Sequence, residues 1–142
     1  AYVIATIASG IVIFLLYSKL KKHWNLFLKF DAIGLGVFTI IGATFAYNIF
    51  GLNFLAILLA GILTAVGGGV LRDVFVNQSP IVFVKEFYLT ASFIGIVIFS
   101  ILLYFTEEIY VATIIGIILT TTLRLIAIKY NWNLPKVKNT DS

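Results

Sequence analysis

Long uncharged, apolar segments alternate with short polar connectors along the whole chain. These segments are Ala1–Ser18, Ala32–Leu71, Phe87–Thr106 and Ile109–Ile128, the last of which contains one charge, Arg124. A helix needs about 20 predominantly apolar residues to cross a bilayer. The segment Ala32–Leu71 is long enough for two such helices, and Asn48, Gly51 and Asn53 near its middle predict a turn between them. The pattern therefore predicts about five spans in an all-α, polytopic membrane helical bundle.

The composition supports the same class. The chain is 61% hydrophobic and 11% charged, whereas a soluble domain carries about 25% charged residues. The formal charge of +4 comes from basic residues that are too scattered for a nucleic-acid-binding face, so we expect no nucleic-acid partner. There is no cysteine, and His23 is the only histidine. We therefore expect no metal site and no cofactor. We also expect no enzymatic activity, because no nucleophile, base and acid form a catalytic set.

The basic residues predict the orientation in the membrane. They follow the first span (Lys19, Lys21, Lys22, Lys29), lie between the third and fourth (Arg72, Lys85), and follow the fifth (Lys129, Lys136, Lys138). All of these connectors fall on one side if each segment crosses once, and the two turns on the other side contain no Lys or Arg. The positive-inside rule makes the basic side cytoplasmic. We expect a multi-pass protein of a prokaryotic cell membrane with a cytoplasmic C-terminus.

The third predicted span ends in the segment Gly67-Gly68-Gly69-Val70-Leu71-Arg72-Asp73. Three consecutive glycines allow a helix to kink or unwind. Carbonyls released there could coordinate a cation, as they do at the broken helices of transporters. We predict a break at Gly67–Gly69, with a short helix resuming over Val70–Val76 and ending before Pro80. The alternative is that the glycines only permit close packing of helices.

Charged residues near this segment predict a network at the cytoplasmic mouth. Arg72 and Asp73 point about 100° apart on a helix, so each needs a partner on another element. Lys85 and Glu86, across the Ser79-Pro80 turn, are the nearest candidates. Such a network could contact ions or only hold the turn in place. Arg124 could reach the cytoplasmic surface or pair with Asp73.

Hydroxyl side chains within the spans are candidates for lining a path. Those considered are Thr39, Thr44, Thr64, Thr90, Ser92 and Thr120–Thr122. Thr44 and Thr64 are preferred because they lie on the two helices that flank the Asn48–Asn53 turn. The alternative is that these hydroxyls bond to the backbone of their own helix. Asp31 precedes the second span and is predicted to cap its N-terminus.

Several of these segments resemble a known family. They are Phe30-Asp31-Ala32-Ile33-Gly34, Gly42, Gly67 to Asp73, Pro80, Lys85-Glu86-Phe87-Tyr88, Arg124-Leu125-Ile126-Ala127 and Pro135. In this order they are similar to the prokaryotic relatives of the TRIC family, the trimeric intracellular cation channels. The resemblance implies two inverted three-helix repeats and a seventh helix. Residues 29–106 would then be the second repeat, residues 107–142 the last helix and tail, and residues 1–28 the last helix of a first repeat with its basic connector. On this reading we expect further sequence upstream.

The same resemblance implies a function. Family members form homotrimers in membrane lipid and conduct monovalent cations, chiefly potassium, through a pore in each protomer that is lined by glycine-kinked helices. Gly67, Gly68 and Gly69 would take that role here, with Thr44, Thr64, Arg72 and Asp73 along the ion pathway. Lys85, Glu86 and Arg124 would form the mouth or gating network. Some bacterial relatives look like small amino-acid transporters, and a non-conducting membrane fragment is a third possibility.

Overall fold

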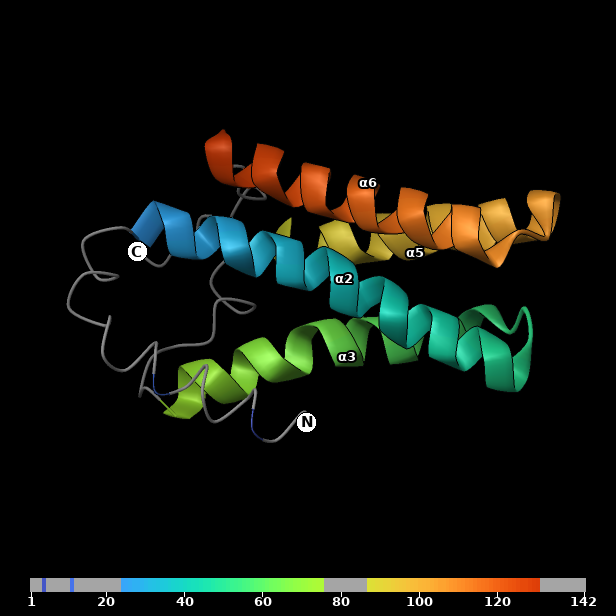
Figure 1. Cartoon of the computed structure of the whole chain (residues 1–142), viewed down its shortest axis with the longest axis horizontal. Coiled ribbons are helices and arrows are strands. Elements are labelled where there is room, and N and C mark those ends of the chain that lie inside the picture. The colour runs from blue at the N-terminus through green and yellow to red at the C-terminus, as the bar shows by residue number, and fades with distance from the viewer. Residues whose placement is uncertain (1–3, 5–10, 12–23, 76–86, 131–142) are drawn as a thin grey trace, which may run out of the picture. The chain divides into compact units, whose positions relative to one another are not determined.

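Four long α-helices make up nearly all of the part of the chain that can be described. The computed structural model describes Ile4, Ile11, residues 24–75 and residues 87–130. Its helices are α2 (Trp24–Phe50), α3 (Phe54–Phe75), α5 (Phe87–Thr106) and α6 (Ile109–Lys129) (Figure 1). The chain divides into two units, residues 1–30 and residues 31–142. Only Ile4, Ile11 and the first turns of α2 are described in the first unit, so the fold below is that of the second.

All four helices contain an apolar stretch that is long enough to cross a membrane. These stretches are Leu28–Phe50, Phe54–Leu71, Phe87–Thr106 and Ile109–Lys129. They match four of the five predicted spans and confirm the all-α, polytopic membrane bundle. The remaining predicted span, Ala1–Ser18, falls outside the described residues except for Ile4 and Ile11.

Both described turns lie where the polar residues predicted them. Gly51 follows α2 with a φ of 62°, a left-handed conformation that glycine adopts without strain. The side-chain oxygen of Asn53 then accepts a hydrogen bond of 3.2 Å from the amide of Ala56, which caps the start of α3. Between α5 and α6, Glu107 has a φ of 56°. The Thr106 hydroxyl donates to the carbonyl of Leu102 at 2.8 Å there, which holds the end of α5.

The prediction that Asp31 caps a helix was wrong. α2 begins at Trp24, so Asp31 lies about two turns beyond its start. The segment Trp24–Phe30 is largely apolar, and its single Lys29 side chain is exposed. A charged side chain therefore does not mark the start of this helix, because helical backbone hydrogen bonds are made internally.

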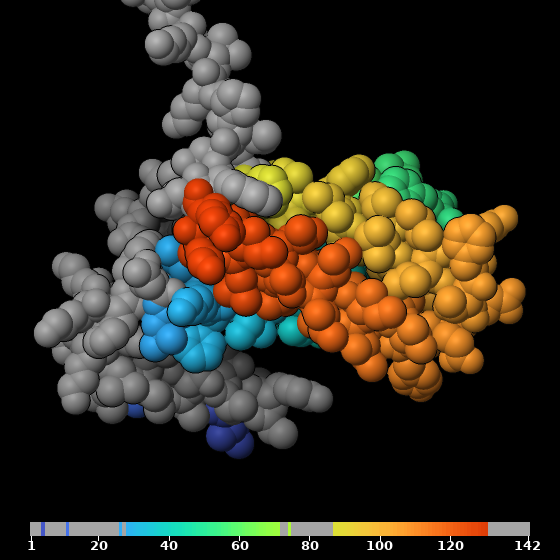
Figure 2. Space-filling model, turned by 90° about the horizontal axis from the view of Figure 1, so that it is seen from above, coloured from blue at the N-terminus to red at the C-terminus, as the bar shows by residue number. Residues whose placement is uncertain are grey.

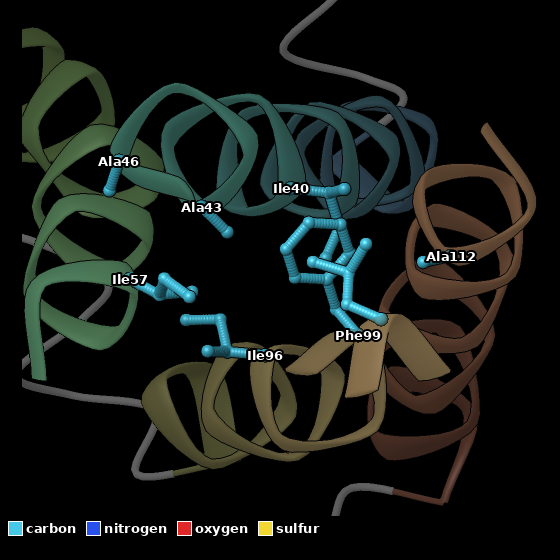
Figure 3. Packing of buried hydrophobic residues seen from close by; sticks show 8 residues of the cluster. Ile40, Ala43, Ala46, Ile57, Ile96, Phe99 and Ala112 are labelled. Atoms are coloured by element: carbon cyan, nitrogen blue, oxygen red, sulfur yellow. The ribbon is translucent and has the colours of Figure 1, made fainter. Parts of the chain in front are cut away.

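A core of branched and aromatic side chains holds the second unit together at its centre. Its fully buried members come from all four helices (Figure 3): Ile40, Ala43, Ala46, Ile57, Ile96, Phe99, Leu103 and Ala112. Figure 3 shows Ile57 of α3 pointing toward Ile96 of α5, and Ile40 of α2 lying against Phe99 of α5. A second, smaller cluster of Leu35, Ala65, Tyr88 and Ala91 lies nearer the predicted cytoplasmic end.

Small residues allow the helices to approach closely. A Cβ atom placed on Gly42 would lie 2.6 Å from the carbonyl oxygen of Ala60 on α3, and one on Gly61 would lie 2.7 Å from Ile96. Close approach through glycine is how membrane helices gain packing contacts without a hydrophobic driving force. Bulky apolar residues point outward instead. Tyr110, Ile114 and Ile118 of α6 are largely exposed. Figure 2 shows α6, in orange, at the surface of the described unit.

Candidate functional site

The glycine segment lies inside α3 and does not break it. The helix runs without interruption from Phe54 to Phe75. The predicted break at Gly67–Gly69 and the separate short helix after it are therefore wrong, although the predicted end near Val76 is close to the observed one. Glycine costs only about 1 kcal/mol per residue in a helix relative to alanine, so three glycines within a long helix do not by themselves unwind it.

Gly67 and Gly68 are not packing residues within the described unit. A Cβ atom on Gly67 or on Gly68 would meet no atom within 4 Å, unlike one on Gly42 or Gly61. Val66 and Val70, which flank the glycines one turn apart, pack against the cluster of Leu35, Ala65, Tyr88 and Ala91. One side of α3 is thus anchored here, and its glycine side opens away from the other described helices.

Exposed residues continue this open side along α3. Leu55, Leu59, Leu63 and Leu71 are all largely exposed, and they follow one another at helical spacing with Gly67 among them. Thr64 is exposed beside them and faces Gly42 of α2, where a Cβ atom would lie 2.6 Å from its hydroxyl oxygen. The open face of α3 therefore carries Gly67 and Gly68 on a leucine background, with Thr64 at its edge toward α2.

Thr44 does not share this face with Thr64. Its hydroxyl lies 3.4 Å from that of Thr113 on α6, in a half-buried position. Several other hydroxyls are also committed to helix packing. The Thr39 hydroxyl lies 2.6 Å from the carbonyl oxygen of Leu35 and 3.0 Å from the hydroxyl oxygen of Ser92. The hydroxyl of Thr120 donates to the carbonyl of Gly116 at 2.8 Å. The backbone-bonding alternative holds for Thr39 and Thr120.

Much of the predicted mouth network lies outside the described residues. Lys85 and Glu86 belong to the segment 76–86, and Arg72 and Asp73 are placed only as backbone within the last turns of α3. Their mutual pairing therefore stays a prediction. Within the described ranges 24–75 and 87–130, no group of three or more His, Asp or Glu side chains could hold a metal ion.

Arg124 is the one member of the predicted network whose side chain is described, and it contradicts the expectation that this arginine reaches the surface. Its pairing with Asp73 stays a prediction, because the Asp73 side chain lies outside the described part of the chain. Only 3% of the residue is exposed, so it does not reach the surface. Its guanidinium carbon lies 4.8 Å from the ring centre of Tyr88, a cation–π geometry. Asp31 and Tyr88 both interact electrostatically with it. The arginine is therefore buried among α2, α5 and α6.

The sequence reasoning missed Tyr88 and misread Asp31. A signal for both was present, because each lies at the start of a predicted span and Arg124 lies near the end of another. Antiparallel helices bring such positions to the same end of a bundle. Only the helix register, which the sequence does not display, shows that the three side chains meet.

The fold and the sequence both match known proteins. A family model described as "Glycine transporter" matches residues 28–104. YadS, an inner membrane protein of Escherichia coli strain K12, is 32% identical over 134 residues, which cover 94% of this chain and 64% of YadS. YvgT, a membrane protein of Bacillus subtilis strain 168, is 36% identical over 96 residues, or 67% of this chain and 47% of YvgT. The chain thus spans less than two thirds of the length of either relative.

Two solved structures have the same fold. A structure of a TRIC cation channel superposes with a TM-score of 0.86 and 33% identity, and the match covers 98% of this chain and 68% of that one. A TRIC trimeric intracellular cation channel orthologue from Rhodobacter sphaeroides superposes with a TM-score of 0.84 and 26% identity over 93% of this chain and 68% of its own. The chain, a multi-pass membrane protein, therefore belongs to the prokaryotic TRIC family, within the group that the "Glycine transporter" family model describes.

Proposed function

We propose that the protein conducts monovalent cations, chiefly potassium, along the open face of α3. The observation that carries this proposal is the contrast between the two sides of that helix at its glycines. Val66 and Val70 are packed, whereas a Cβ atom on Gly67 or Gly68 would meet nothing within 4 Å. Because Gly67 and Gly68 have no side chains and no packing contacts on this face, the backbone of α3 is accessible to a permeant ion there. The two structural neighbours, described as TRIC cation channels, support ions as the permeant species.

In this proposal the pathway passes Thr64, Gly67, Gly68 and Gly69, and Arg72 and Asp73 stand at its cytoplasmic mouth with Lys85 and Glu86. We leave Thr44 out, because its hydroxyl faces Thr113 of α6. The proposed assembly is a homotrimer in membrane lipid, with one pathway in each protomer. The protein would act as a passive channel, with neither a catalytic role nor a cofactor.

A second candidate is a transporter of glycine or another small amino acid. The description of the matching family model favours it, because that model covers residues 28–104 and hence all of the open face of α3. A glycine stripe serves this function equally well, since it makes room for a small solute. The two candidates differ in the flux they predict. A channel passes discrete ion currents, whereas a transporter shows saturable flux of its particular solute.

Recording from purified protein in planar bilayers under a potassium gradient tests the first candidate. Discrete unitary currents that reverse near the potassium equilibrium potential are the expected result. A silent bilayer combined with saturable glycine counterflow into liposomes from the same preparation would instead establish the transporter.

A further inference from the structure

The predicted cytoplasmic end of the second unit contains a buried charge cluster that joins three helices. Arg124 of α6 is 3% exposed, and its guanidinium lies 4.8 Å from the ring centre of Tyr88 on α5. One carboxylate oxygen of Asp31 on α2 is buried as well. The guanidinium of Arg124 thus lies inside the helix bundle, and the half-buried Asp31 turns one carboxylate oxygen toward its interior.

The register of α2 against α6 independently brings Asp31 close to the level of Arg124. Gly36 of α2 lies against Thr121 of α6. One turn further along α2, Ile40 lies against Gly116, and one turn beyond that the Thr44 hydroxyl is 3.4 Å from that of Thr113. The two helices therefore run antiparallel in steady register. One more turn toward the N-terminus of α2 leads from Gly36 to the first residues of the predicted span. One more turn toward the C-terminus of α6 leads from Thr121 to Arg124, so these two positions lie at the same level.

A guanidinium inside an apolar bundle requires a counter-charge. Ionised side chains within membrane spans face the protein interior and pair with one another or with backbone carbonyls. The Nε atom of Arg124 is buried and has no hydrogen-bond partner among the described residues, and the charges nearby that favour its ionised form are those of Asp31 and Tyr88. Removing one member of a buried pair is costly because the other charge remains behind.

The charge cluster also connects to the glycine segment of α3 through Tyr88. Tyr88 belongs to the hydrophobic cluster with Leu35, Ala65 and Ala91, and Val66 and Val70 pack against that hydrophobic cluster. These two valines flank Gly67–Gly69 along α3. Whatever fixes Tyr88 therefore fixes the packed side of α3 at the turn where its opposite side is open.

We infer that Arg124, Asp31 and Tyr88 form an intramembrane clamp that joins α2, α5 and α6 and positions the glycine segment of α3. This inference rests on the proposed function in one respect, that the glycine segment lines the transport pathway. The three clamp residues are positioning residues. They lie within the bundle, on the side of α3 that is packed, and Arg124 is not a pathway charge.

A double-mutant cycle tests the clamp without any transport measurement. Asp31→Asn and Arg124→Gln should each lower the melting temperature of the detergent-solubilised protein by about 5 °C or more, since each leaves one charge buried alone. The double variant should lose clearly less than the sum of the two losses, because no unpaired charge remains. Lys129→Gln is the matched control. It also removes a cation from α6, but from an exposed position, and should shift melting by under about 2 °C. Additive losses in the cycle would overturn the clamp.

Single-channel recording separates a positioning role from a pathway role. Arg124→Gln should lower the open probability, while the unitary conductance and the reversal potential stay at their wild-type values. Arg124→Lys and Tyr88→Phe, which keep the cation and the ring, should recover most of the open probability. They also keep the test usable if Arg124→Gln does not fold. A changed unitary conductance or reversal potential in Arg124→Lys would put the charge in the pathway and overturn the positioning role.

The two proposals fail separately. A coupled cycle in a protein that passes no current under any condition would leave the clamp in place and remove the channel. Additive losses of melting temperature in a protein that shows normal currents would remove the clamp and leave the channel in place.

Discussion

Glycines in the described helices fall into groups that their surroundings distinguish. Gly36, Gly42, Gly61, Gly95 and Gly116 lie where a Cβ atom would collide with a neighbouring helix. Gly67 and Gly68 lie where it would meet nothing within 4 Å. The sequence alone presents both groups as glycines in apolar helices, so it could not show which of them pack against a neighbouring helix. The difference depends on which side of a helix faces its neighbours.

Alanine at both Gly67 and Gly68 should stabilise the protein and impair conduction. Each substitution adds helix propensity worth up to about 1 kcal/mol without creating a clash, so the free energy of unfolding should rise. The added methyl groups would project from the open face of α3 and narrow the proposed path. Unfolding in detergent and unitary conductance in bilayers measure the two effects. Unchanged conductance in a folded double variant would remove these glycines from the pathway.

Alanine at Gly42 should act in the opposite way. Its Cβ atom would lie 2.6 Å from both the Ala60 carbonyl oxygen and the Thr64 hydroxyl oxygen, so α2 and α3 must separate. Overpacking of this kind costs about 1–3 kcal/mol. A fall in melting temperature is expected, in contrast to the rise at Gly67 and Gly68. An equal rise at all three sites would show that propensity alone governs glycine substitutions here.

Valine at Thr39 tests the buried hydroxyl pair between α2 and α5. The substitution keeps the branched shape and removes a hydroxyl that lies 3.0 Å from the hydroxyl oxygen of Ser92. Interhelical hydrogen bonds in membrane proteins contribute about 0.6 kcal/mol on average and up to about 1.7 kcal/mol. A melting shift of that size is expected, and adding Ser92→Ala should cost little more. A Thr39→Val variant as stable as the wild type would mean that the pair makes no net contribution.

At the scale of the elements, the apolar pattern predicted α5 from Phe87 to Thr106 and α6 from Ile109 to within one residue of its observed end. Periodicity and charge are enough for this because the bilayer imposes the length of each span. Span length alone does not explain the two failures. A glycine run favours a break, yet α3 continues through it without interruption. A charge favours a boundary, yet Asp31 lies inside both the span Leu28–Phe50 and α2.

The candidate site was less predictable than the helices. Arg124 stood out in the sequence as a charge inside a span, yet its partners Asp31 and Tyr88 are distant along the chain. Their meeting depends on the antiparallel register that Gly36, Gly95 and Gly116 establish by close approach. If α2 and α6 packed in another register, Arg124 or Asp31 would face lipid. The pairing is therefore a property of the packed helices and not of any single segment.

At the scale of the whole molecule, the predicted orientation can be tested directly because the chain contains no cysteine. A single cysteine at Glu107, in the exposed turn between α5 and α6, should react in intact cells with a membrane-impermeant maleimide. One at Lys129, at the exposed end of α6, should react only after the membrane is opened. The basic connectors favour this arrangement. The reverse labelling pattern would place the C-terminus outside.

The placement of charges also bears on where a trimer could conduct. Within the described spans, Asp31 and Arg124 are held inside the bundle, and the exposed residues of α3, α5 and α6 are uncharged up to Lys129. A threefold axis lined by these faces would be apolar through most of the bilayer. A closed cyclic trimer repeats the same interface around this axis. Because an apolar axis would not conduct ions, the proposed path would lie within each protomer.

We therefore expect a mass of three protomers in mild detergent and three independent pathways in each trimer. Mixing wild-type protomers with the Gly67→Ala, Gly68→Ala double variant distinguishes this arrangement from one central pore. With separate pathways, each mixed trimer shows wild-type and reduced unitary levels that open independently, in proportion to its composition. A central pore lined by all three protomers would give one level of intermediate size. A stable monomer or dimer would exclude the trimer itself.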